Sequence, residues 1–265
     1  MKNISIFEAM RFIFKIVDFI VVSNLYVAAG TFSLSWLTFQ FYGSDNLVYP
    51  LFVFFSTLFA YNFMRLVRVK PMLEEGDSSR HKNIYRYRAY LWATCLLAAF
   101  TALFFFLQVD AIILNTLIVM GVISIAYSLP LYKNNGQWLR LRDLPFIKIF
   151  LIALVWTVVS TIIPMQIVQV PINWLKVLER FCFVLAITIP FDIRDLKFDS
   201  SELYTLPQVL GIKKSKYLGV SLLLVAEMIL FYEYYFLNLY NLAGALAIYI
   251  AYEFAAVLVY KADTS

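Results

Sequence analysis

The stretch IFLIALVWTVVSTIIPM, residues 149–165, decides the fold, because it runs for 17 positions without a charged side chain. A helix needs about 20 predominantly apolar residues to cross a bilayer, and similar stretches recur along the chain. Of its 265 residues, 62% are hydrophobic and 15% charged, whereas a soluble domain has about 45–50% apolar and about 25% charged residues. This composition excludes a soluble globular enzyme, a disordered chain and a collagen-like fibre, and it predicts a polytopic membrane protein.

Eight apolar segments are predicted to cross the membrane as helices, because a backbone in lipid must satisfy its own hydrogen bonds. They are residues 13–40, 47–69, 84–107, 110–129, 144–165, 172–191, 215–237 and 240–260, each to within a few positions. The short alternating strands of a membrane barrel are not evident in the sequence. A cleavable signal peptide is not expected, since Asp18 and Asn24 interrupt the first segment.

Basic residues predict the orientation of these segments. All but Lys176 and Arg180 of the 22 basic residues fall in the two termini or in the connections after the second, fourth and sixth segments. The positive-inside rule makes those regions cytoplasmic. We therefore expect a multi-pass protein of a bacterial inner or plasma membrane with both termini in the cytoplasm, and a site on the cytoplasmic side.

The polar connections suggest an internal symmetry. The two longest begin near Asn62 and Asp192, four segments and 130 residues apart. The predicted fold is therefore all-α: a single transmembrane domain, residues 1–265, in which two pseudo-repeated four-helix halves, about 1–130 and 140–265, surround a central cavity.

The sharpest polar motif is Asp192-Ile-Arg-Asp195-Leu-Lys-Phe-Asp199. At about 100° per residue of a helix, its three carboxylates share one face, and Arg194 and Lys197 point to the other side. Carboxylates that can act together with phosphate oxygens suit Mg²⁺. The motif predicts a magnesium site; the alternative is a solvated helix end on which acids and bases mix without a ligand.

Two further polar stretches supply candidate anion-binding groups. Asn62 and Arg65 share a face after the second segment and can bind anionic oxygens, whereas Arg68 lies off that face. Their alternative role is anchoring at the interface, with arginine reaching toward water. Tyr127 and Lys133, after the fourth segment, can donate to phosphate oxygens; alternatively, they belong to an aromatic belt and to the cytoplasmic positive charge.

Other reactive side chains within the apolar segments are few. Cys95 and Cys182 are predicted to be small core residues and not a disulfide or metal site. Glu179 and Arg180 lie near the start of a segment and are expected to reach the interface. The acidic residues at membrane depth are Asp18, Glu179, Glu227 and Glu233, and no proton relay is proposed from them.

In this order the motifs resemble those of the UbiA-type membrane prenyltransferase superfamily, over most of the chain. Residues 192–199 look like the second aspartate-rich motif of that family, residues 127–133 like its diphosphate-holding element, and residues 205–214 like the segment after the second motif. The resemblance implies that a prenyl diphosphate binds in a lateral cavity with Mg²⁺. Its prenyl group would then pass to a lipophilic acceptor such as an aromatic ring, which makes the protein a transferase of alkyl or aryl groups other than methyl.

The chain departs from the family at the first motif, which runs Asn-x-x-x-Asp-x-x-x-Asp. Counted from Asn62, the aspartate positions hold Leu66 and Lys70, and the family commonly has nine helices instead of eight. One hypothesis is that Arg65, Arg68 or Lys70 binds the diphosphate directly in place of a metal ion. The other is a non-catalytic relative that binds an isoprenoid or another anionic lipid, or serves as a structural partner. A transporter is a third class, disfavoured because polar residues gather on one side.

The predicted site therefore combines three sets of side chains. The catalytic residues are Asp192 and Asp195, and the Mg²⁺ ligands are Asp192, Asp195 and Asp199. The diphosphate contacts are Asn62, Arg65, Arg68, Tyr127 and Lys133. The expected partners are a prenyl diphosphate, a lipophilic acceptor and the lipid bilayer, with no nucleic acid.

Overall fold

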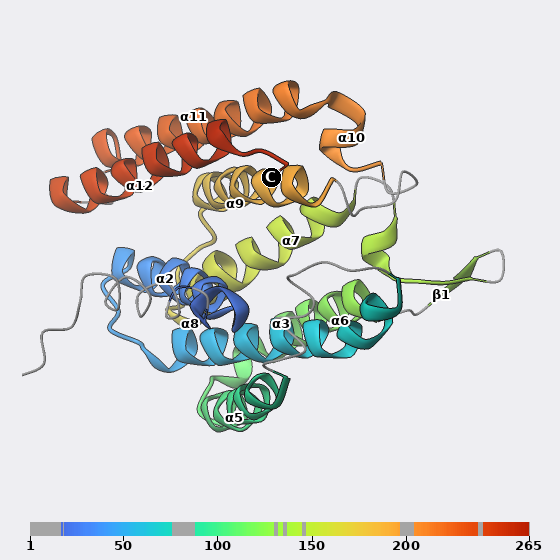
Figure 1. Ribbon diagram of the computed structural model, residues 1–265. Helices are drawn as coiled ribbons and strands as arrows, with labels where there is room; N and C mark the ends of the chain where they lie inside the picture. Colours follow the sequence, from blue (N-terminus) through green and yellow to red (C-terminus); the bar gives the residue numbers. More distant parts are fainter. Residues whose placement is uncertain are drawn as a thin grey trace, which may run out of the picture. The chain divides into compact units, whose positions relative to one another are not determined.

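The computed structural model is built almost entirely of helices (Figure 1). It describes residues 17, 19–75, 88–129, 132–134, 137–144, 147–196, 204–237 and 241–264; within these, the side chains of 67–75, 132–134, 137–139 and 143 are not described. The α-helices are α2 (Leu25–Phe41), α3 (Val48–Glu75), α5 (Arg88–Phe106), α6 (Leu114–Ser128), α7 (Ile147–Thr157), α8 (Ile163–Ile167), α9 (Trp174–Asp195), α10 (Leu206–Leu210), α11 (Ile212–Tyr235) and α12 (Leu242–Lys261). Short 3₁₀ turns form η1 (Ala111–Ile113) and η2 (Leu141–Asp143), and η3 (Val158–Ile162) is a π-helical turn.

The protein is a helical membrane protein. Among the residues that the structure describes, five helical stretches are long and apolar enough to cross a bilayer. They are Arg88–Phe106, Ala111–Ser128, Ile147–Ile167, Ile212–Tyr235 and Leu242–Lys261. Each coincides with a segment predicted from the sequence, which predicts eight in all.

A small β-hairpin follows α6 and was not expected from the apolar pattern. Its strands, β1 (Tyr132–Asn134) and β2 (Gln137–Leu139), pair antiparallel, with Tyr132 opposite Leu139. The intervening dipeptide is Asn135-Gly136, one of the strongest sequence signals for a two-residue hairpin connection. A local turn signal therefore adds a short hairpin to an otherwise helical fold.

The chain forms two compact units. One comprises Met1–Leu37 and Asp45–Val109, and the other comprises Thr38–Ser44 and Asp110–Ser265. The boundary between the two compact units falls after Val109. The polar loops instead suggest a boundary near residue 130. The last turn of α2 belongs to the second unit.

In the first unit, α3 packs along α5 through apolar side chains. Leu66, Leu91 and Cys95 are buried together, and Phe59 and Phe63 pack against them. Cys95 is a free, buried thiol in the second of these helices, and Cys182 in the other unit is likewise free and buried. The prediction that both cysteines are core residues is confirmed.

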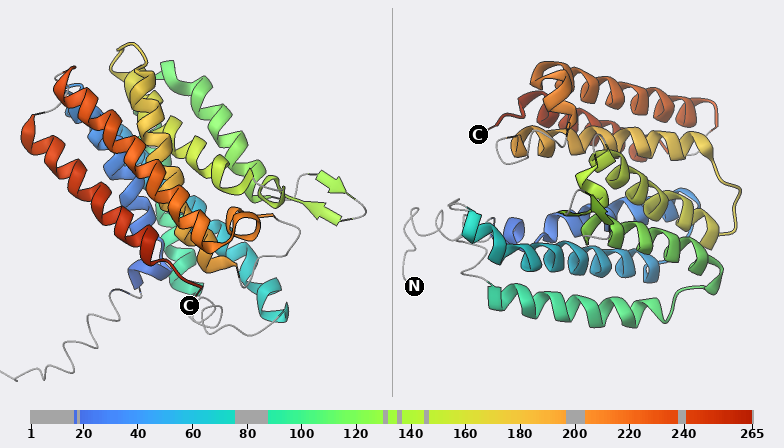
Figure 2. Two further views of the ribbon diagram at one scale, coloured as in Figure 1. Left: turned by 90° about the horizontal axis from the view of Figure 1, so that it is seen from above. Right: turned by 90° about the vertical axis from the view of Figure 1, so that its right-hand side faces the viewer.

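In the second unit, α9 lies between α7 on one side and α11 with α12 on the other (Figures 1 and 2). Pro190 lies within α9 and cannot donate to the carbonyl of Ala186, four residues earlier. That carbonyl faces Gly219 of α11, where an added Cβ would lie 3.8 Å from it and only 2.7 Å from Cγ1 of Val259. The glycine therefore lets α11 and α12 approach α9 closely beside the proline.

Candidate functional site

Asp192, the first aspartate of the predicted magnesium motif, is buried at the C-terminal end of α9, with only 2% of its surface exposed. Its Oδ1 atom lies 2.9 Å from Nζ of Lys148, in the first turn of α7. A buried carboxylate needs such a partner, because an isolated charge is costly to remove from water. Lys148 is a functional candidate that the sequence pattern had assigned only to the general cytoplasmic charge.

Asp195 lies one turn further along α9 and has a different environment. Arg194 Nε is 2.9 Å from Asp195 Oδ1, and both side chains are about one third exposed, at 35% and 32%. The prediction that Arg194 points away from the aspartate face is wrong, because its long side chain folds back onto the neighbouring carboxylate. A pair this exposed contributes roughly 0–1 kcal/mol, so its members can exchange partners easily.

The third aspartate, Asp199, lies outside the described residues. Within the parts of the chain that the structure describes, no group of three or more His, Cys, Asp and Glu side chains could hold a metal ion. The described motif thus offers two carboxylates, Asp192 and Asp195. This donor set fits Mg²⁺ in sites where substrate phosphates complete the coordination, since that ion is often bound by one or two carboxylates.

Tyr127 lies at the end of α6, and the guanidinium carbon of Arg142 in η2 is 5.3 Å from the centre of its ring. The end of α6, the hairpin, η2 and the start of α7 follow one another at one end of the second unit (Figure 1). The ion pair of Lys148 with Asp192 brings the C-terminal end of α9 to this same end. Lys133 is in β1, and its side chain is outside the described residues.

In the first unit, Asn62 and Arg65 are joined through Asn24. Asn24 Nδ2 donates to Asn62 Oδ1 at 2.9 Å, and Arg65 Nη2 donates to Asn24 Oδ1 at 2.7 Å. Arg65 also donates to the carbonyl oxygens of Val21 and Val22. The side chain of Arg68, the third candidate in this stretch, lies outside the described residues.

Asn24 explains why Arg65 is there. Its φ of 57° lies in the left-handed region, which asparagine tolerates, and it interrupts the helical backbone just before α2. Such a break leaves carbonyl groups without helical partners, and a membrane offers no water to replace them. Arg65 satisfies the carbonyls of Val21 and Val22, so it stabilises the helix break.

Asn62 keeps an unpaired donor among the described residues. Arg65 can only donate, so its partner on Asn24 must be the amide oxygen. The amide nitrogen of Asn24 therefore faces Asn62 and needs an acceptor, which is Asn62 Oδ1. Asn62 Nδ2 is buried and has no hydrogen-bond partner among the described residues. A buried donor of this kind is costly unless a ligand or a rearrangement satisfies it.

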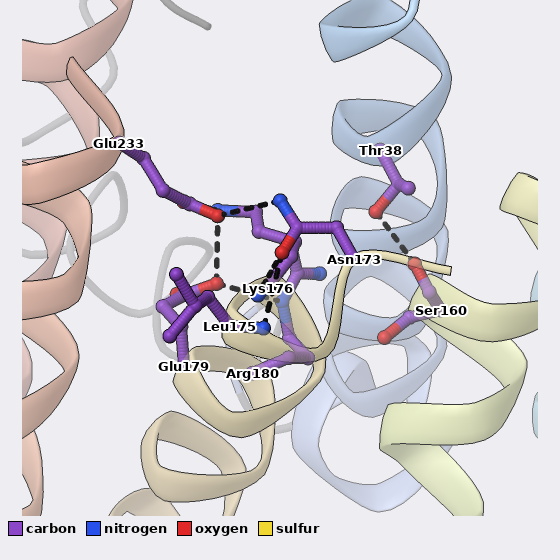
Figure 3. Close-up of polar contacts among 8 residues, drawn as sticks. All are labelled: Thr38, Ser160, Asn173, Leu175, Lys176, Glu179, Arg180 and Glu233. Carbon is purple, nitrogen blue, oxygen red and sulfur yellow. Dashed lines mark hydrogen bonds and ion pairs between the residues drawn. The ribbon is translucent and has the colours of Figure 1, made fainter. Parts of the chain in front are cut away.

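A second group of charges occupies the opposite, N-terminal end of α9 (Figure 3). Lys176 Nζ is 2.9 Å from Glu179 Oε2 and 3.3 Å from Glu233 Oε2 of α11. We call this set, all buried apart from Asn173, the Lys176 cluster: Asn173, Lys176, Glu179, Arg180 and Glu233. The expectation that Glu179 and Arg180 reach the interface is wrong, because both are buried among opposite charges.

Asn173 ties the Lys176 cluster to the helix backbone. Its Oδ1 accepts from the N–H groups of Leu175 and Lys176, which caps α9, and its Nδ2 donates to Glu233 Oε1 at 3.1 Å. Burial raises the pKa of the adjacent Tyr42, the Glu233 charge raises it further, and a hydrogen bond with Asn173 opposes the rise. The two cations and two anions of the Lys176 cluster are buried, and their formal charges balance.

Comparisons of the chain with protein-family models, with curated proteins and with solved structures find no match. Its chemistry is therefore interpreted from its own geometry. Polar groups collect at both ends of α9. The end with Asp192 also presents partly exposed charges, whereas the Lys176 cluster is enclosed.

Proposed function

We propose that the protein is a membrane-embedded prenyltransferase-like protein that takes a prenyl diphosphate and transfers its prenyl group to a lipophilic acceptor, for example an aromatic one. The ion pair of buried Asp192 with the largely covered Lys148 is the observation that carries this proposal. It puts a carboxylate suited to Mg²⁺ beside an ammonium group suited to phosphate. The order of motifs, which resembles that of the UbiA-type superfamily, supports the same function.

Each polar group has a role in this proposal. Asp192, Asp195 and Asp199 would hold Mg²⁺, which when bound neutralises charge on the departing diphosphate. Lys148 would donate to a phosphate oxygen. Asn62, with its unpaired amide donor, stays a candidate diphosphate contact. Arg65, Arg68, Tyr127 and Lys133 remain candidate diphosphate contacts, with Arg65 restrained by its bonds to the backbone.

The proposal includes eight membrane crossings, with the five candidate spans joined by α2, α3 and α9. These helices have 17, 28 and 22 residues, which correspond to lengths of about 26, 42 and 33 Å at 1.5 Å per residue. The hydrocarbon core of a bilayer is about 30 Å thick. The charges in the first turns of α9 are compensated within the Lys176 cluster, which lowers the cost of placing them in a membrane.

The same proposal includes two four-helix halves, about 1–130 and 140–265, and both termini in the cytoplasm of a bacterium. Lys176 and Arg180 were the exceptions to the one-sided distribution of basic residues. Their burial beside glutamates supports the orientation, because paired and enclosed charges are poor topological signals.

Prenyl transfer is tested with the purified full-length protein, Mg²⁺, prenyl diphosphates of several lengths and aromatic acceptors. We expect Asp192→Asn and Asp195→Asn each to lower turnover at least about 100-fold, since each removes a charge that holds the metal. Asp263→Asn, at an exposed position near the C-terminus, is the matched control. Turnover that survives both substitutions contradicts the proposal.

Because Asp192→Asn also leaves Lys148 without its carboxylate, loss of turnover must be separated from loss of folding. The double variant Asp192→Asn/Lys148→Met restores charge balance, and its melting temperature reports the fold. A folded double variant without turnover supports a functional role for the pair. A double variant as active as the wild type contradicts it.

A non-catalytic isoprenoid- or lipid-binding relative is the second candidate function. It is favoured because each described carboxylate of the motif has a cation 2.9 Å away and Leu66 stands at a metal-ligand position of the first family motif. Thermal unfolding with prenyl diphosphate, with and without Mg²⁺, distinguishes the two functions. A shift that requires the metal favours the transferase, and an equal shift without it favours the binding protein.

A further inference from the structure

The π-helical turn η3 interrupts the helix formed by α7 and α8. The N–H of Ile163 donates to the carbonyl of Val158, five residues earlier, and Pro164 follows at once. Proline has no N–H, and its ring clashes with the carbonyl four residues before it, here that of Ser160. The wider turn relieves this clash, and π turns within helices are frequent at functional sites.

The carbonyl that Pro164 leaves without a helical donor is satisfied from another element. Thr38 Oγ1, in the last turn of α2, donates to Ser160 O at 2.7 Å (Figure 3). The carbonyl of Ser160 therefore has a hydrogen-bond donor within the second unit. The hydroxyl groups of the same region have no such partner among the described residues.

Thr157, Ser160 and Thr161 are 2%, 1% and 0% exposed, and none of their hydroxyl groups has a hydrogen-bond partner among the described residues. Ser35 of α2 is a further buried hydroxyl without a partner in the described part of the chain, but eight other described helical hydroxyls donate to a carbonyl of the preceding turn. They are those of Thr31, Thr94, Thr101, Ser124, Ser128, Thr188, Ser215 and Ser221. Among the described residues, three unpaired hydroxyls within five positions occur at η3 and the last residue of α7, and each is costly in an apolar interior.

The helix that carries these hydroxyls has no ionisable side chain of its own near them. The sequence has no ionisable residue from Ile149 to Ile167, and Thr157 lies nine residues, or about 14 Å, along the helix from Lys148. The charges of the Lys176 cluster, on α11 and on the helix α9 that packs against η3, are paired with one another. We therefore expect a group that bonds to these hydroxyls to be uncharged and to lie at membrane depth, well away from the pair of Lys148 and Asp192.

We propose that Thr157, Ser160 and Thr161 bind the uncharged, oxygen-bearing head group of a lipophilic molecule, a ketone, quinone or phenol, that enters from the bilayer. The hydroxyls donate to its carbonyl oxygen or accept from its hydroxyl group. In the ligand-free protein the three oxygens are covered, so binding requires the helix to open at η3. This inference does not depend on prenyl transfer or on Mg²⁺.

The test compares ligands of one shape that differ in oxygen content. Acetylnaphthalene and naphthol are titrated against the full-length protein in detergent, with ethylnaphthalene as the hydrocarbon control and without diphosphate or metal. Thr157→Val and Thr161→Val remove a hydroxyl at nearly constant volume. Thr101→Val is the matched control, since the Thr101 hydroxyl donates to the carbonyl of Leu97 at 2.8 Å.

We expect at least one oxygenated probe to bind the wild type more tightly than ethylnaphthalene, and each η3 variant to weaken that binding about tenfold. Without ligand, the same variants should melt about 2–4 °C higher, because they lose a buried unpaired hydroxyl. Thr101→Val should change neither quantity. Equal affinity for all probes, or unchanged affinity in the variants, overturns the proposal. A lower melting temperature does so as well, because it shows that the hydroxyls have partners in the ligand-free protein.

Discussion

The two ends of α9 bury charge in different ways. At the N-terminal end, Lys176 contacts two glutamates inside an enclosed group of two cations and two anions. At the C-terminal end, buried Asp192 has the 12% exposed Lys148 as its partner, and the next aspartate forms a partly exposed pair with Arg194. A charge whose partners are all enclosed maintains structure, whereas a charge beside exposed neighbours can exchange its partner for a ligand.

The ends also differ in what holds the neighbouring helix. Near the N-terminal end, Glu233 of α11 is bound to α9 through Lys176 and Asn173. Near the C-terminal end, α11 and α12 pack through the gap left by Gly219. Electrostatic contacts therefore fix one end of this interface and apolar close packing fixes the other.

The largest expected effect comes from Lys176→Met. It leaves Glu179 and Glu233 buried without their shared cation, and breaking a buried ion pair costs about 3–5 kcal/mol. Thermal or denaturant unfolding in detergent measures the loss. Lys213→Met, at an exposed lysine of α11, is the control and should be nearly neutral.

A double variant sharpens this result. Adding Glu233→Gln to Lys176→Met leaves Arg180 with Glu179, so the buried charges balance again and most of the lost stability should return. If Lys176→Met unfolds no more easily than the control, the Lys176 cluster does not hold this end of α9.

The sequence predicts the helices well and the partners of charged residues poorly, for a physical reason. Apolar stretches directly reflect burial in lipid, and Lys176 with Glu179 has the three-residue spacing of a helical pair, a signal that was present but not used. Lys148 and Asp192 are far apart in the chain, as are Lys176 and Glu233, so tertiary packing alone selects these pairs.

The candidate site shows the same division. The periodicity of α9 correctly placed Asp192 and Asp195 near one helix end, but it gave Arg194 the wrong direction, because a flexible side chain can fold back on its neighbour. Asn24 was recognised only as an interruption of an apolar segment. In the structure Asn24 breaks the helix with its left-handed φ, and its side chain accepts a hydrogen bond from Arg65.

A smaller effect is expected at the packed end, from Gly219→Ala. The new Cβ would lie 2.7 Å from Cγ1 of Val259 and 3.3 Å from Cδ1 of Ile189. Overpacking of this kind costs about 1–3 kcal/mol, visible as a lower melting temperature. Gly121→Ala in α6 is the control, since nothing lies within 4 Å of its Cβ, and there alanine should stabilise the helix by roughly 0.5–1 kcal/mol.

The double variant Gly219→Ala/Val259→Ala tests the mechanism. Val259→Ala removes the Cγ1 atom that clashes, so the two substitutions together should cost less than the sum of their separate effects. Strict additivity would mean that the glycine is not needed for close approach.

The smallest effect concerns pH and returns to the enclosed end. The pKa of Tyr42 is raised above its ordinary value of 10.0 by burial first and by the Glu233 charge second. Well below pH 10 both the folded and the unfolded chain keep the phenolic proton. Between pH 10 and the folded pKa only the unfolded chain releases it, so the free energy of unfolding must fall as the pH rises.

Tyr42→Phe lacks this titration, so its stability should decline less steeply above pH 10 than that of the wild type, while Tyr217→Phe at an exposed tyrosine should follow the wild type. Glu233→Gln should weaken the slope but not abolish it, because burial remains when the charge is gone. If the free energy of unfolding falls equally steeply above pH 10 in Tyr42→Phe and in the wild type, neither burial nor the Glu233 charge shifts the pKa of Tyr42. The contrast between the two ends of α9 would then rest on the ion pairs alone.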